Sequence, residues 1–98
     1  MPTNPPVSVN PSVELATEEL VALEAAVHTT RTARDELRAS LPATPAEWLA
    51  EHHAAWQQAY LAYGAAVSRA QDALTAHAQQ TGHPRHKVEA AVKAAATA

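Results

Sequence analysis

Prolines divide this chain into segments, and their positions limit the folds open to it. Residues 12–41 and 46–83 contain no proline, and the link between them carries Pro42 and Pro45. Proline removes a backbone donor and clashes with the preceding helical turn, so long helices can form only on either side of this link. A link this short allows only a tight reversal, and the two helices should pack antiparallel. The pattern predicts an all-α fold built on a long two-helix hairpin.

The first helix of this hairpin is predicted over residues 13–41. Asn10 and Pro11 form one possible start. Thr17 followed by two acids forms a second, because acids suit the positive end of a helix dipole. The apolar stripe of this helix alternates steps of four and three residues, which is a heptad pattern and favours coiled-coil-like packing. It runs through Ala16, Leu20, Leu23, Val27, Thr30, Arg34, Leu37 and Leu41.

The second helix is predicted over residues 45–80. Thr44 stands as its N-cap and Pro45 as its first residue, a position that suits the fixed backbone of proline. Glu47, three residues after Thr44, completes a capping box. This pattern is the sharpest local signal in the sequence, and it places Trp48 inside the second helix.

The hairpin, residues 13–81, has a different kind of segment on each side. Residues 1–12 hold four prolines, which predict an extended arm. In an extended segment Val7 and Val9 point the same way, so the arm offers two small apolar contacts to a partner. Residues 82–98 begin with a glycine and a proline that end the second helix, and they continue as a short basic helix.

Composition limits how much core the hairpin can bury. The chain of 98 residues has 25 Ala, eight Leu and eight Val, but no Phe and no Ile. Alanine forms helix well and buries little area, and burial contributes about 25 cal/mol per Å². Few aromatics and two glycines argue against a β-sandwich, a barrel or a dinucleotide-binding domain. We therefore expect self-association or docking on another protein to cover the open sides of the helices.

Charge and sequence signals exclude several other classes of protein. The net charge of −3 provides no general attraction to nucleic acid or to an anionic membrane, and we expect neither as a partner. The absence of Cys excludes a disulfide framework and thiol chemistry. No signal peptide and no membrane-length apolar run is visible. These features favour a location in the cytoplasm, or in a particle assembled there.

Acidic and histidine side chains gather near the start of the second helix, where Glu47, Glu51, His52 and His53 follow one another. Di-metal bundles use Glu and His one helical turn apart, and neighbouring residues do not share a helix face. We interpret the acids as ion-pair partners of the arginines on the facing part of the first helix, Arg34 and Arg38. We expect no catalytic residue, no metal and no cofactor, and the protein is predicted not to be an enzyme. A small ligand- or metal-binding helical bundle stays a further alternative.

Aromatic residues form the strongest candidate binding feature. Trp56, Tyr60 and Tyr63 follow helical spacing, and Trp48 lies off that stripe near the link. Such a stripe packs either against the first helix or against a partner, and Trp and Tyr are enriched at binding hot spots. The favoured function is therefore a non-enzymatic structural, assembly or adaptor subunit, for instance a small component of a virion. It would bind protein through its helix faces and its N-terminal arm.

The sequence Trp48-Leu49-Ala50 beside the link is similar to a known motif. The Trp-X-Gly helical-hairpin substrates of type VII secretion are about this long, and two helices flank the turn that bears their tripeptide. Ala50 stands where that family has glycine, and no Tyr with an acid four residues later follows the second helix. The resemblance covers residues 13–81 and implies an alternative function, a secreted hairpin protein that acts as a dimer.

Overall fold

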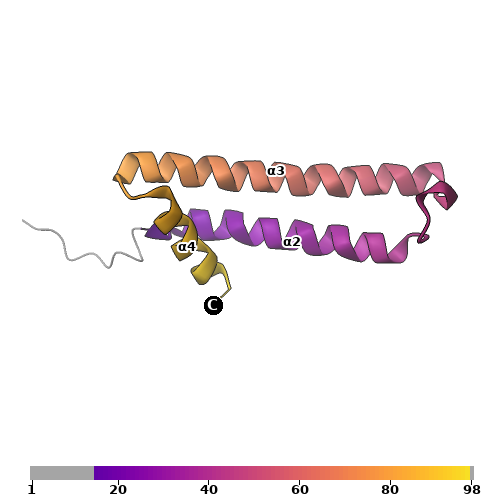
Figure 1. Cartoon of the computed structure of the whole chain (residues 1–98), viewed down its shortest axis with the longest axis horizontal. Helices are drawn as coiled ribbons and strands as arrows, with labels where there is room; N and C mark the ends of the chain where they lie inside the picture. The colour runs from indigo at the N-terminus through magenta and orange to yellow at the C-terminus, as the bar shows by residue number, and fades with distance from the viewer. Residues whose placement is uncertain (1–14, 98) are drawn as a thin grey trace, which may run out of the picture.

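The computed structural model describes residues 15–97, and every regular element in that range is helical (Figure 1). The prediction of an all-α fold is confirmed. The predicted arm, with Val7 and Val9, lies outside the described residues. None of the described helices is both long and apolar enough to span a bilayer. The elements in order are α2 (Glu18–Ser40), the 3₁₀ helix η1 (Pro45–Glu47), α3 (Ala50–Thr81) and α4 (Arg85–Ala96).

Helix α2 begins at the second of the two predicted starts. The hydroxyl oxygen of Thr17 accepts a hydrogen bond from the backbone N–H of Leu20 at 3.2 Å, which satisfies one free donor of the first turn. The helix ends one residue before the predicted limit, because Leu41 is extended (φ −88°, ψ 158°). Leu41 precedes Pro42, and the proline ring disfavours helical backbone in the residue before it.

The predicted start of the second helix is wrong. The side chain of Thr44 makes no capping hydrogen bond, and Pro45–Glu47 forms only a short 3₁₀ turn. The backbone is extended at Trp48 and again at Leu49, so α3 begins at Ala50. A histidine side chain caps α3 in place of Thr44. The ring Nδ1 of His52 accepts a hydrogen bond from the backbone N–H of Leu49, three residues earlier, at 2.9 Å. The predicted C-terminal stop is confirmed, since α3 ends at a glycine with φ of 78°.

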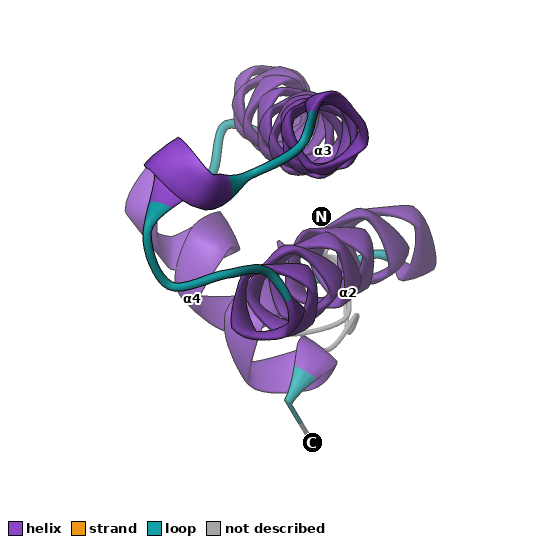
Figure 2. Cartoon of the chain, turned by 90° about the vertical axis from the view of Figure 1, so that its right-hand side faces the viewer, coloured by secondary structure: helices purple, strands orange, loops and turns teal. Residues whose placement is uncertain are grey.

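The two long helices lie side by side, and α4 crosses the end of the pair that is remote from the turn (Figure 1). Figure 2, which looks from the turn, shows α4 and the turn segment on the same side of this pair. We call this side of the pair the α4 side. The end of the pair at which α4 packs is called the α4 end.

The core is confined to the α4 end and its neighbourhood. One buried cluster joins all three helices there, and a second lies next to it between α2 and α3. Leu74, Val88 and Val92 are the most deeply buried side chains, at 2% exposure or less. No residue from 28 to 65 is buried. The buried apolar residues are Leu20, Val27, Ala66, Ala70, Leu74, Ala78, Val88 and Val92.

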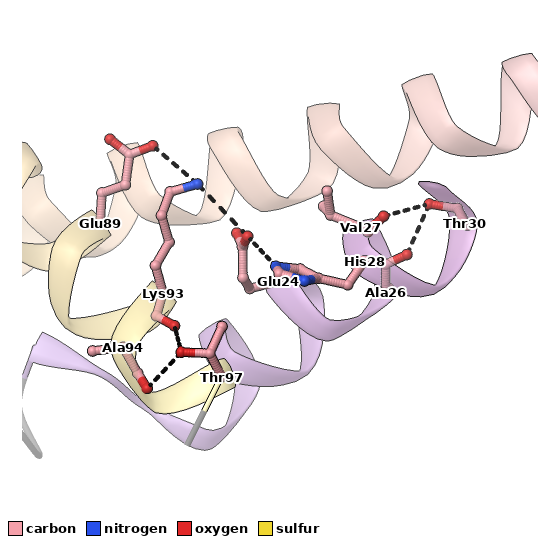
Figure 3. Close-up of polar contacts among 9 residues, drawn as sticks. All are labelled: Glu24, Ala26, Val27, His28, Thr30, Glu89, Lys93, Ala94 and Thr97. Atoms are coloured by element: carbon pink, nitrogen blue, oxygen red, sulfur yellow. Dashed lines mark hydrogen bonds and ion pairs between the residues drawn. The ribbon is translucent and has the colours of Figure 1, made fainter. Parts of the chain in front are cut away.

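One buried carboxylate helps to fix α4 on the pair. Glu24 of α2 is 4% exposed, and its Oε2 accepts from His28 Nε2 at 3.0 Å (Figure 3). The ammonium Nζ of Lys93 on α4 lies 3.6 Å from the same oxygen, and 3.9 Å from Glu89. An ionised carboxylate is costly to bury without partners, so Glu24 ties the position of α4 to the presence of Lys93.

Candidate functional site

Three aromatic rings form a row beside the turn. Trp48 stands in the extended segment before α3, and Trp56 and Tyr60 follow one helical turn apart on α3. The ring centroids are 6.1 Å apart from Trp48 to Trp56 and 6.3 Å apart from Trp56 to Tyr60. His53 adds a fourth ring, 5.1 Å from Trp48. All three members of the row are candidate binding residues predicted from the sequence, and the structure brings them together.

The fourth predicted aromatic residue, Tyr63, lies between the two long helices. It is half-buried against the core cluster of Val27, and two arginines of α2 lie over its ring. The guanidinium carbon of Arg34 is 4.6 Å from the ring centroid and that of Arg31 is 5.8 Å away. A side-chain hydrogen bond to Tyr63 raises the pKa of Arg31 above its ordinary value. Arginines over aromatic faces gain cation–π attraction and hold a defined orientation.

A third arginine joins this row of bases to the turn. The guanidinium carbon of Arg38 is 5.3 Å from the ring centroid of Trp48. Its Nη2 donates to the carbonyl oxygen of Ala43 at 3.0 Å, and its Nη1 to that of Pro42 at 3.4 Å. We call the combined surface the turn face, and it consists of Arg31, Arg34, Arg38, Trp48, Trp56, Tyr60 and Tyr63.

The turn face lies on the α4 side. Tyr60 is three helical turns from Gln71, which accepts a hydrogen bond from Arg85 of α4. Arg31 is two turns from Glu24, which contacts Lys93 of α4. Residues separated by whole turns share a helix face. The turn face therefore continues the strip on which α4 packs, at the end that α4 does not reach.

Apolar surface is exposed along this part of α3. Tyr60 is 58% exposed and Leu61 is 60% exposed, and Leu49 before the helix is 58% exposed. A shallow hollow of about 320 Å³ lies between Trp56, Gln57, Tyr60 and Leu61. Exposed side chains such as Tyr60 and Leu61 beside the half-buried ring of Trp56 are typical of a protein-binding surface.

The predicted ion pairs between the helices are absent from the described residues. Arg34 instead donates from Nε and Nη2 to its neighbour Asp35, at 3.2 and 3.0 Å. Arg38 uses its guanidinium on the carbonyl oxygens of the turn. The expected partners Glu47 and Glu51 form no ion pair with either arginine. The prediction fails because each arginine binds oxygens within five residues of its own position instead.

The histidines near the turn have structural contacts. His52 caps α3 and His53 packs on Trp48. Among residues 15–97, no three His, Asp or Glu side chains converge as a metal site would require. What the site offers chemically is a set of aromatic rings and guanidinium groups held in place, which suits binding.

Sequence reasoning missed Arg31, Leu49 and Leu61 as members or neighbours of the site. The arginines do carry a readable signal, because Arg31, Arg34 and Arg38 follow steps of three and four residues and so share one helix face. The exposure of Leu61 has no such signal, since an apolar residue in a helix is normally assigned to a core.

Comparison of the chain with protein-family models, with curated proteins and with solved structures finds no match. The function is therefore inferred from the geometry of the turn face.

Proposed function

We propose that this chain is a non-enzymatic assembly or adaptor subunit that binds a protein partner through the turn face. The observation that supports this function is the uneven distribution of the core. All four aromatic residues of the chain lie between residues 28 and 65, where no residue is buried. Aromatic residues normally supply the largest burial in a small protein, so four that are half-buried or exposed are consistent with another surface covering them.

Both side-chain types of the turn face favour protein binding. Trp, Tyr and Arg are the residues most enriched at interface hot spots. The arginines are already oriented by Tyr63, Trp48 and the turn carbonyls, so less side-chain freedom is lost when a partner binds. The α4 end has a different role in this proposal, because its core holds the helices together.

Site-specific photo-crosslinking tests the proposal. A photoreactive phenylalanine derivative would replace Tyr60 in one variant and Gln79 in a matched variant. Gln79 is exposed on the same helix but lies at the α4 end, outside the turn face. In cells that make the protein, we expect a discrete crosslinked adduct from position 60 and none from position 79. Equal labelling from both positions, or none from either, would contradict the proposal.

A second candidate function has one observation in its favour. The structure places Trp48 in the turn between the two long helices, where the sequence analysis had put it inside a helix. A tryptophan in the turn is also the arrangement of the Trp-X-Gly secretion substrates, although Ala50 replaces their glycine. This resemblance implies a secreted hairpin that works as a dimer. Sedimentation of the full chain at micromolar concentration tests this candidate, because a hairpin that works as a dimer should sediment as a dimer without any partner.

A further inference from the structure

We infer that the partner seated on the turn face is an acidic, amphipathic α-helix of another protein. This inference depends on the proposed function and adds the chemistry of the partner to it. Three features of the face lead to it: the spacing of its rings, the arginines that it presents, and the poor fit of a second copy of the chain.

The ring spacing matches a helical ligand. The centroids of Trp48, Trp56 and Tyr60 advance in steps of 6.1 and 6.3 Å. An α-helix advances about 5.4 Å per turn, so apolar side chains at positions i, i+4 and i+7 of a ligand could each meet one ring. The hollow beside Trp56 and Tyr60 gives one of these side chains a place to enter.

The arginines of the turn face favour an acid in the ligand. Arg34 and Arg38 of α2 lie over the rings of Tyr63 and Trp48, and among residues 15–97 the only carboxylate paired with the arginines of the face is Asp35, which binds Arg34. Arg31 forms no ion pair within residues 15–97. Guanidinium groups with free N–H donors bind carboxylates in a well-defined geometry. A ligand helix with carboxylates along one edge of its apolar stripe would satisfy both rows at once.

A second copy of this chain fits the face less well. Two copies stacked on it with their turns at the same end would place both α4 helices in the same space, because α4 lies on this side (Figure 2). With the turns at opposite ends, two-fold symmetry places α2 against α2. The arginine row of one copy then meets the same row of the other, and like charges repel. Residues 1–14 of the chain carry a single acid, Glu14, so they also lack the required charge.

The experiment uses the intrinsic fluorescence of the full chain. Trp48 and Trp56 are its only tryptophans, and both belong to the turn face. The probe is a synthetic 18-residue helical peptide without aromatic residues, with leucines at i, i+4, i+7 and i+11 and glutamates beside them. A twin peptide carries Gln in place of every Glu. We expect saturable binding of the Glu peptide with a blue shift of the emission, and about tenfold weaker binding of the Gln twin.

Matched variants locate the effect on the protein. In the double variant Arg31→Gln with Arg34→Gln, the affinity for the Glu peptide should fall to that of the Gln twin. Arg69→Gln removes an exposed arginine of α3 outside the face, and it should leave the affinity unchanged. Far-ultraviolet circular dichroism must show the same helix content in all variants. A further variant, Tyr60→Ala, should weaken the binding of both peptides by the same factor.

Several results would overturn the inference. Equal binding of the two peptides would remove the preference for acid. Tighter binding of a single-stranded oligonucleotide than of the Glu peptide would make the face a nucleic-acid interface. A blue shift that grows with protein concentration alone would make the occupant a second copy. If no probe binds while the crosslink at position 60 persists, the acidic helix is wrong and the proposed function stands. If both are absent, both proposals fail.

Discussion

The indole Nε1–H of Trp48 donates a 2.7 Å hydrogen bond to the carbonyl oxygen of Pro42, six residues earlier. This bond closes the turn segment on itself and holds the indole outside both long helices. Arg38 reaches the same carbonyl oxygen from the end of α2. The turn is therefore a small folded unit, and it sets the position of the first ring of the turn face.

Removing this hydrogen bond should weaken the turn. Trp48→Phe keeps an aromatic ring but loses the N–H donor, and we expect a loss of about 1 kcal/mol in the free energy of unfolding. Urea unfolding followed by circular dichroism measures the change. Trp56→Phe serves as a control, because Trp56 has ring contacts and no hydrogen bond to the turn. The role assigned to the Trp48 N–H is wrong if both variants lose the same stability.

Two threonines test which caps stabilise the helices. Thr17→Ala should cost about 1 kcal/mol, because it removes the oxygen that accepts the Leu20 N–H. Thr44→Ala should change stability by less than about 0.5 kcal/mol, because its side chain caps nothing. Chemical denaturation midpoints at constant slope measure both. A larger effect at Thr44 would mean that the second helix begins there in solution.

Two leucines of α3 test the location of the core. Leu74 is 2% exposed and Leu61 is 60% exposed. We expect Leu74→Ala to cost about 2–5 kcal/mol, since it leaves a cavity, and Leu61→Ala to cost less than about 0.5 kcal/mol in the protein alone. Thermal unfolding at one protein concentration compares them. Comparable losses would show that Leu61, and with it the hollow beside Trp56 and Tyr60, is covered in the isolated protein.

The contact between Glu24 and Lys93 should hold α4 in place. Lys93→Met keeps the aliphatic chain but removes the ammonium group beside a buried carboxylate, and we expect a loss of about 1–2 kcal/mol. Lys87→Met, on the same helix, removes an exposed lysine without an ion pair among the described residues. Melting temperatures should fall only for Lys93→Met. A fall of the same size in both variants would assign the effect to net charge.

The helical nature of the chain could be predicted because it depends on local properties. Helix propensity and the positions of Pro42 and Gly82 act within a few residues, and the sequence displays them directly. The start of α3 could not be predicted in the same way. The pattern formed by Thr44, Pro45 and Glu47 satisfies the local rule for a cap, but the backbone is extended at Trp48, whose indole N–H is bonded to Pro42.

The burial of Glu24 also lay beyond sequence reasoning. In the heptad pattern Glu24 stands beside the apolar stripe, and nothing local distinguishes it from the exposed Glu18 and Glu19. It becomes buried because α4 returns over the same face of α2 from about 70 residues later in the chain. Contacts between distant segments decide such positions. The aromatic members of the turn face were predictable by residue type, whereas their exposure depends on where α4 stops.

The confinement of the core to one end gives the molecule two regions of unequal stability. Amide hydrogens near Leu74 and Val88 can exchange with solvent only when the whole core opens, whereas those of residues 28–65 can exchange through local fraying of the helix pair. A ligand bound to the turn face would suppress this fraying and slow amide exchange in residues 28–65. Amide exchange at the α4 end would be unchanged. Occupancy of the face could thus be followed residue by residue, even for a partner whose identity is still unknown.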